Sequence, residues 1–105
     1  MTRVEFFDHE GRITGFCCSG HSGYAEAGSD IVCAAVSALT QGAVIGLKEV
    51  IGLGIALDIS DGYMYCMLPK KISAAQQHDA ELILNTMAAS IASLAETNGD
   101  YIKLT

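Results

Sequence analysis

The stretch from residue 31 to residue 47 limits the possible folds of this 105-residue chain more than any other feature of its sequence. It is nearly all apolar or small, and charged residues bracket it on both sides. A helix that spans a membrane needs about 20 apolar residues, whereas this stretch is shorter and contains Ser37, Thr40 and Gln41. We therefore predict a buried helix over about 30–51 and no contact with a membrane.

Side chains of this predicted helix are small along one line and apolar elsewhere. Four small residues recur every four positions and so share one face of the helix, namely Ala34, Ala38, Gly42 and Gly46. A stripe of this kind lets another backbone approach closely. Because the other faces are apolar as well, the helix should be buried over most of its surface. In so small a domain we expect it to pack on its own sheet and against a second subunit, which predicts a homodimer.

Turn signals and a second amphipathic pattern complete the predicted fold. Turns near Gly11 and at Asp61-Gly62 each join two short stretches typical of strands, and Ser73 is the expected cap of a second helix. The predicted strands cover about 3–8, 12–19, 55–60, 63–68 and 101–104, and the predicted helices about 30–51 and 73–96. This order, ββαββαβ, indicates an α+β fold with two helices packed on a mostly antiparallel sheet, in a single domain over residues 1–105.

The charge balance argues against one class of partner. The formal net charge is −6 at pH 7. A module that binds nucleic acid through its phosphates carries the opposite sign, so we expect no direct nucleic-acid binding. Opposite net charge speeds the encounter of two proteins, so this balance suits a basic partner.

The cysteine pattern indicates free thiols. Cys17, Cys18, Cys33 and Cys66 form no C-x-x-C pair, and the N-terminus shows no secretory signal. A disulfide framework is therefore not expected, and we predict reduced thiols in a cytoplasmic protein. Cys66 lies in a strand-like run, where a buried structural cysteine is the simplest interpretation.

Residues able to carry chemistry gather between positions 20 and 37. His21 lies in a glycine-rich stretch that we expect to be a mobile loop. Ser29 or Asp30 would cap the long helix, which places Cys33 in its first turn. Unpaired N–H groups and a partial positive charge at a helix start lower the pKa of a thiol there, and the same groups can bind an oxyanion. A nearby imidazole would supply the general base.

Each of these features also has a plainer explanation. A cysteine in an apolar run is most often core packing, and an aspartate before a helix is often only its cap. The cysteines at 17, 18 and 33 together with His21 are four potential metal ligands. Their spacing departs from structural zinc patterns, and adjacent residues of a strand point to opposite faces. We therefore expect no metal and no cofactor. Two alternatives stay open: a non-catalytic ribosome-assembly or binding protein of the same fold, and a Cys/His metal-binding module, which the spacing disfavours.

Two runs of the sequence resemble the signature of the ribosomal-processing cysteine proteases of bacteria. They are Gly20-His21-Ser22 and Gly28-Ser29-Asp30-Ile31-Val32-Cys33-Ala34-Ala35-Val36-Ser37. That signature has a Gly-His step, a glycine-containing loop, and Gly-x-Asp-Ile-Val-Cys-Ala with a serine soon after. The likeness extends over nearly the whole chain and includes the Leu-Ile-Leu-x-Thr-Met run at 82–87. Two departures are Ser22, where alanine is common, and the Cys17-Cys18 pair beside this loop.

The resemblance implies a function and the residues for it. Members of that family remove a short N-terminal extension from a basic protein of the large ribosomal subunit, the twenty-seventh in its numbering, and cut after an aromatic pair. They are dimeric and use a Cys–His dyad, which implies Cys33 as the nucleophile and His21 as the base, with Asp30 and Ser37 as supporting residues. Their glycine-rich loop is thought to order over the substrate. Its counterparts here are Gly20, Ser22, Gly23 and Gly28.

Overall fold

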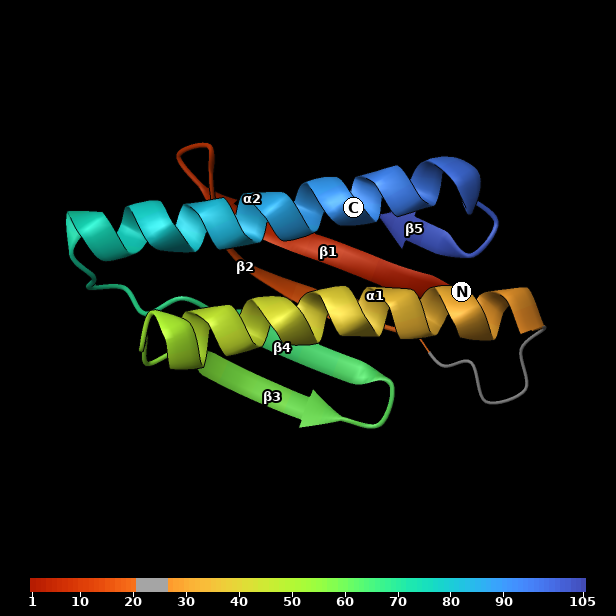
Figure 1. Ribbon diagram of the computed structural model, residues 1–105, viewed down its shortest axis with the longest axis horizontal. Coiled ribbons are helices and arrows are strands. Elements are labelled where there is room, and N and C mark those ends of the chain that lie inside the picture. The colour runs from red at the N-terminus through yellow and green to blue at the C-terminus, as the bar shows by residue number, and fades with distance from the viewer. Residues whose placement is uncertain (21–26) are drawn as a thin grey trace.

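The computed structural model describes residues 1–20 and 27–105, and within them it has the predicted order of elements (Figure 1). The strands are β1 (Thr2–His9), β2 (Arg12–Ser19), β3 (Ala56–Ser60), β4 (Tyr63–Met67) and β5 (Ile102–Leu104). The helices are α1 (Ala27–Ile45), which continues into a π-helical segment η1 (Gly46–Val50), and α2 (Ala74–Thr97). The order ββαββαβ is confirmed.

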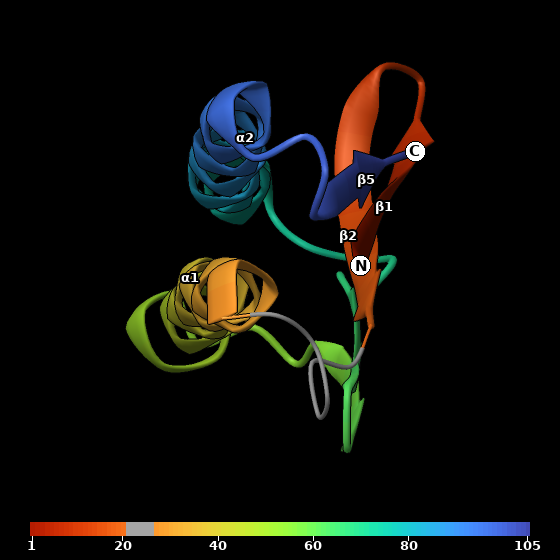
Figure 2. The same ribbon diagram turned by 90° about the vertical axis from the view of Figure 1, so that its right-hand side faces the viewer.

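The strands form one sheet in the order β3-β4-β2-β1-β5. Neighbouring strands are antiparallel except β1 and β5, which run parallel. Both helices lie on the same side of the sheet, as Figure 2 shows. The predicted α+β architecture, two helices packed on a mostly antiparallel sheet, is therefore confirmed.

Tight turns fix the register of the two hairpins. Between β1 and β2, Glu10 has a φ of 54° and Gly11 a φ of 79°, the pair of positive angles that defines a type I′ turn. Between β3 and β4, Gly62 has a φ of 70°. Because β4 also pairs with β2, Ser19 lies opposite Tyr63. This pairing brings the end of β2 beside the β3–β4 turn.

The core lies between the sheet and the two helices. Alternate residues of the central strands point toward the helices and are buried, among them Val4, Phe16 and Cys66. The buried residues of α2 are Ala80, Leu84, Met87 and Ile91. They recur at three and four residues, as predicted for one apolar face. Each large apolar side chain that is fully buried stabilises the fold by about 1.5–3 kcal/mol, so this layer holds the sheet and helices in fixed relative positions.

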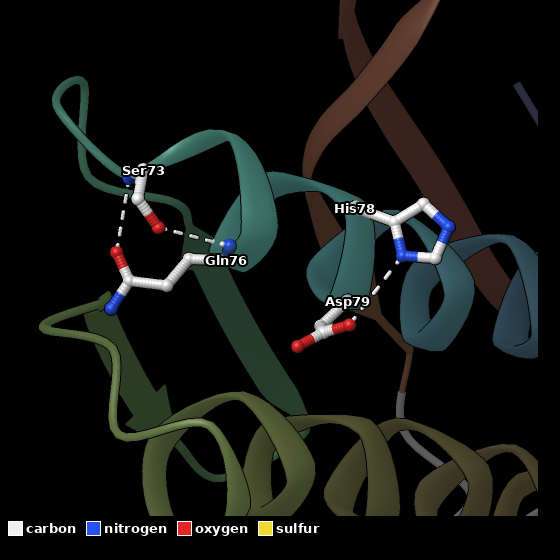
Figure 3. Close-up of polar contacts among 4 residues, drawn as sticks. All are labelled: Ser73, Gln76, His78 and Asp79. Carbon is white, nitrogen blue, oxygen red and sulfur yellow. Dashed lines mark hydrogen bonds and ion pairs between the residues drawn. The ribbon is translucent and has the colours of Figure 1, made fainter.

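A capping box starts α2 at the predicted cap, Ser73 (Figure 3). Ser73 Oγ accepts a hydrogen bond from the Gln76 N–H at 3.1 Å, and Gln76 Oε1 accepts one from the Ser73 N–H at 3.0 Å. A cap of this kind contributes about 1 kcal/mol. In the next turn, His78 Nδ1 lies 3.5 Å from Asp79 Oδ1 on the exposed side of the helix.

The start of α1 differs from the prediction. The helix begins at Ala27, so Gly28 and Asp30 belong to its first turn rather than to a loop or a cap. Cys33 is the seventh residue of the helix, and its predicted position in the first turn is wrong. The physical reason is that each residue added to a helix gains a hydrogen bond. Alanine has the highest helix propensity, which offsets the cost of about 1 kcal/mol for one glycine.

Only one side of α1 is buried within the chain. Val36 and Leu47 are fully buried on the side of the sheet, whereas Ile31 and Ile45 are 70% and 52% exposed. The segment Ile31–Val50 is long and apolar enough to cross a membrane by those two criteria, which the core helix of a soluble protein also meets. Within a single chain the predicted burial is therefore found on one side only, because the outer side of α1 has no layer above it among the described residues. The second subunit that was predicted to cover this side stays a prediction.

The stripe of small residues on α1 has two different environments. A Cβ on Gly46 would lie 2.9 Å from Cδ1 of Ile83 in α2, so this glycine lets the two helices approach. A Cβ on Gly42 would meet nothing within 4 Å. Gly46 therefore serves packing within the chain, whereas Gly42 borders an open space.

Candidate active site

A cavity of about 180 Å³ lies where the end of β2, the first half of α1 and the β3–β4 turn meet. In Figure 1 this turn lies on the same side of the molecule as the N-terminal half of α1. The cavity is lined from the sheet by Cys18 and Gly20, from the helix by Cys33, Ser37 and Thr40, and from the hairpin by Ile59, Tyr63 and Met64, among others. Three of the predicted site residues, Gly20, Cys33 and Ser37, are thus found around one space.

The helical repeat places polar residues of α1 on the side of this cavity. Cys33, Ser37 and Thr40 are spaced by four and three residues, so they share one face of the helix. Thr40 is 1% exposed, and its Oγ1 lies 3.0 Å from the Val36 carbonyl oxygen and 3.1 Å from that of Ser37. The Thr40 hydroxyl is therefore satisfied within the helix, whereas Cys33 and Ser37 line the cavity in a half-buried position.

The two adjacent cysteines of β2 face opposite sides of the sheet. Cys18 pairs with Val4 and Met64, whose side chains are buried beneath the helices, and it lines the cavity. Cys17 pairs with Tyr65 and is absent from the cavity wall. The strand pattern predicted this alternation. Because Cys17 lies on the other face of the sheet, it cannot bind one metal ion together with the other cysteines.

The surroundings of Cys18 and Cys66 raise the pKa of both thiols. Burial first, and then the negative charges that Cys33 and Cys17 would carry as thiolates, raise the pKa of the Cys18 thiol to about 11. Burial also raises the pKa of the Cys66 thiol to about 11. Both groups are therefore protonated at neutral pH, and a protonated thiol is a poor nucleophile. Of the two cysteines at the cavity, Cys33 is the better candidate for the nucleophile.

Gly20 forms a wall of the cavity through a close approach of two chain segments. Its φ is 133°, and a Cβ at this position would collide with the Met1 carbonyl oxygen and lie 2.9 Å from the Thr2 Cα. The Gly20 N–H donates a hydrogen bond to the Gly62 carbonyl oxygen at 3.1 Å, which ties the end of β2 to the β3–β4 turn. Glycine is thus required here for a structural reason.

Part of the predicted site lies outside the described residues. His21, Ser22 and Gly23 follow Gly20 directly in the sequence, and the structure does not describe them. The predicted pairing of His21 with Cys33 and the predicted loop over the substrate therefore stay predictions. For Asp30, the structure gives only its helical backbone.

The start of α1 does not account for the reactivity of Cys33 in the way predicted. Unpaired N–H groups belong to the first four residues of a helix, here 27–30, and later N–H groups bond within the helix. The field of the helix end also falls off within the first turn. Cys33 lies beyond that turn, so a catalytic role for Cys33 would require a nearby base more than the sequence indicated.

Sequence reasoning missed the cavity wall that the β3–β4 hairpin contributes. Ile59, Tyr63 and Met64 line the cavity although they are far from Cys33 in the sequence. The pairing of β4 with β2, which sets Met64 opposite Cys18, brings them there. No local pattern records a pairing across an intervening helix, so sequence alone gave no signal for it.

Comparisons with known proteins point to one group of proteases. The sequence profile of a family described as cysteine protease Prp matches residues 1–103. The ribosomal processing cysteine protease Prp of Bacillus subtilis is 31% identical over 99 residues, covering 92% of this chain and 88% of the relative. The protein of the same name from Staphylococcus aureus strain Mu50 is 32% identical over 100 residues, covering 90% of this chain and 88% of the relative.

Solved structures share the whole fold. The ribosomal processing protease Prp of S. aureus in complex with a substrate peptide has a TM-score of 0.85 at 27% identity, covering 100% of this chain and 98% of that one. The same protease with a covalently linked product peptide has a TM-score of 0.82 at 28% identity, with the same coverage. A protein from Streptococcus mutans has a TM-score of 0.85 at 26% identity, covering 100% of this chain and 92% of that one.

Proposed function

This chain belongs to the Prp family of cysteine proteases, and we propose that it removes a short N-terminal extension from the twenty-seventh protein of the large ribosomal subunit. Its relatives from B. subtilis and S. aureus are named as ribosomal processing proteases, and the resemblance to the family implies this particular substrate. The observation that carries the proposal is the position of Cys33, the cysteine of the family-like motif, on the wall of a cavity with Gly20 and Ser37.

The surroundings of the other three cysteines make each of them a poorer nucleophile for this reaction, which supports the assignment of Cys33. Cys66 is 1% exposed and belongs to the core. Cys17 lies on the opposite face of the sheet from the cavity. Cys18 lines the cavity, but its raised pKa keeps it protonated at neutral pH. Only the thiolate attacks a carbonyl, so Cys33 is the cysteine best placed for this step.

In the proposed reaction, His21 takes the proton of the Cys33 thiol, and the thiolate attacks the carbonyl carbon of the peptide bond. The imidazolium then gives its proton to the leaving amine, which becomes the new N-terminus of the ribosomal protein. The extension stays on Cys33 as a thioester until water hydrolyses it. We assign supporting roles to Asp30 and to Ser37, which lies one turn after Cys33 on the same cavity wall.

The substrate is proposed to bind between this cavity and the residues that precede α1. The proposed contacts are Gly20, Ser22 and Gly23 from this segment and Gly28 from the first turn of α1. The net charge of −6 favours encounter with a basic ribosomal protein, because opposite charges steer association. This pairing also fits a protease that acts in the cytoplasm, where ribosomal proteins are made.

We further propose that the active form is a homodimer joined through the outer sides of α1 and α2. An open groove of about 1050 Å³ runs between these helices and is lined largely by small and apolar side chains, such as Ala38, Leu39 and Ala89. Ile31 and Leu82 are 70% and 58% exposed on the surface of a single chain. Exposed apolar side chains beside an open groove are typical of interaction sites, and the family resemblance implies a dimer.

The test is cleavage of the precursor of that ribosomal protein from the same organism, followed by intact-mass analysis. We expect two products whose masses add up to the precursor plus one water, with the cut after an aromatic pair. Cys33→Ala should leave the precursor intact, and Cys17→Ala, on the other face of the sheet, should cleave it normally. A precursor that folded wild-type enzyme leaves whole would reject this substrate, and cleavage by Cys33→Ala would reject this nucleophile.

A further inference from the structure

The second cysteine of the cavity has no part in the proposed reaction. Cys18 and Cys33 line the same cavity of about 180 Å³ from its two sides, one on β2 in the sheet and one on α1 in the helical layer (Figure 2). Both are half-buried, and all four cysteines of the chain are free thiols. A charge on Cys33 also contributes to the raised pKa of Cys18, after the larger effect of burial.

We propose that Cys18 is the resolving cysteine for Cys33. When a hydroperoxide oxidises Cys33, Cys18 captures it in a Cys18–Cys33 disulfide, which stops the protease reversibly and protects its nucleophile from irreversible oxidation. The effect on activity rests on the proposed function of Cys33, whereas the disulfide itself depends only on the placement of the two thiols.

The chemistry balances with one equivalent of hydroperoxide. The Cys33 thiolate attacks an oxygen of the peroxide, the O–O bond breaks, and the hydroxide or alkoxide that leaves takes up a proton. Cys33 is then a sulfenic acid. The neutral sulfenic acid no longer carries the thiolate charge that helps to raise the pKa of Cys18. The sulfur of Cys18 then attacks the sulfur of Cys33, and the hydroxyl group leaves with the Cys18 proton as water. Two sulfur atoms have been oxidised and one peroxide reduced, and a dithiol reverses the change by thiol–disulfide exchange.

The other two cysteines lack this placement. Cys17 is next to Cys18 in the sequence, but it pairs with Tyr65 and faces the other side of the sheet. Cys66 points toward the helices like Cys18, but it is 1% exposed in the core and does not line the cavity. Cys17 is therefore a matched control, since it differs from Cys18 by one position and by the face it occupies.

The test treats reduced protein with a small molar excess of hydrogen peroxide and maps its peptides without reduction. Wild type should lose about 2 Da, the mass of two hydrogen atoms, and yield a peptide that joins Cys18 to Cys33. Protease activity should fall with formation of this peptide and return with dithiothreitol. Cys17→Ser should behave in the same way. In Cys18→Ser, the peptide that carries Cys33 should gain about 32 Da as a sulfinic acid, and dithiothreitol should not restore activity.

The outcomes separate this proposal from the proposed function. Wild type that accumulates sulfinic acid on Cys33 without a link to Cys18 overturns the proposal, as does loss of the cross-link in Cys17→Ser. A Cys18–Cys33 cross-link in a protein that never cleaves the ribosomal precursor supports the resolving role and rejects the substrate. If peroxide inhibits cleavage but no cross-link forms, the proposed protease function stands and the resolving role of Cys18 is rejected.

Discussion

The first and second halves of α1 pack on the same sheet but meet it differently. In the first half, Cys33 and Ser37 face a cavity. In the second half and the π-helical segment after it, Ala43, Val44 and Leu47 fill the space against the sheet and are buried. One continuous helix thus carries both a candidate catalytic residue and part of the core.

The difference shows how a small domain combines a cavity with stability. Apolar side chains that fill a core stabilise it, and every unfilled volume forfeits part of that energy. Here the cavity beneath the first half of α1 lies at the end of the sheet where β2 and the β3–β4 turn meet. The packed half of the helix then holds the residues at the cavity in place. Substitutions in the two halves should therefore have separable effects, on turnover in the first half and on folding in the second.

The largest effect is expected for Cys33→Ala. Loss of the nucleophile should lower turnover of the ribosomal precursor by about 10⁴-fold or more, because Cys18, the other thiol that lines the cavity, is protonated at neutral pH. The thermal midpoint of unfolding should change little, since the side chain is only half-buried and borders a cavity. Single-turnover cleavage and thermal unfolding, measured on the same preparation, test the predicted loss of turnover and the predicted unchanged stability. A large fall in stability would mean that Cys33 is a packing residue.

His21→Ala should have the next largest effect. Removal of a general base typically slows the chemical step by about 10²–10⁴-fold, and the displaced position of Cys33 in the helix increases its dependence on that base. The pH dependence of kcat/KM should lose the acidic limb that wild type shows near the pKa of an imidazole. Near-normal turnover by His21→Ala would show that another group activates the thiol.

Leu47→Ala should act on folding and leave the chemistry intact. Leu47 is fully buried, and truncation of such a leucine costs about 2–5 kcal/mol of unfolding free energy. Ser37→Ala in the first half should cost far less, because Ser37 is half-buried at a cavity. Denaturant unfolding of both variants measures the contrast. Equal losses of stability would refute the division of α1 into two parts.

The smallest effects concern the outer side of the helix. Gly46→Leu would collide with Ile83 of α2 and should destabilise the fold, since overpacking costs about 1–3 kcal/mol. A Cβ on Gly42 meets no atom of the described residues within 4 Å, so Gly42→Leu should leave the monomer folded and weaken the proposed dimer. Light scattering at micromolar concentration together with thermal unfolding distinguishes the two variants. Wild type that is monomeric under these conditions would reject the dimer.

Local patterns account for the parts of the fold that the sequence predicted well. The Asp61-Gly62 turn, the Ser73 cap and the spacing of the buried residues in α2 all depend on neighbours within a few positions. The predicted beginning of α1 was wrong, because a good cap at Asp30 does not stop a helix from extending toward Ala27. Several positions can start a helix, and the sequence did not discriminate between them.

The candidate site was predictable only in part, for a similar reason. Cys33 and Ser37 follow from the helical repeat and from the family-like motif, and both line the cavity. The wall made by Tyr63 and Met64 depends on the pairing of β4 with β2, which no local pattern records. The position of Cys18 at the same cavity as Cys33 depends on the same strand register, so it emerged only from the fold.

The most direct test of the central claim, that Cys33 in the first half of α1 is the nucleophile, is capture of the covalent intermediate. Enzyme and precursor are mixed at equal concentration, stopped in acid within one turnover, and digested at low pH to preserve a thioester. The account predicts that the N-terminal extension is attached to the peptide that carries Cys33, and that mild hydroxylamine releases it. An extension found on a peptide with Cys17, Cys18 or Cys66, or cleavage that proceeds with no adduct on any cysteine, would contradict it.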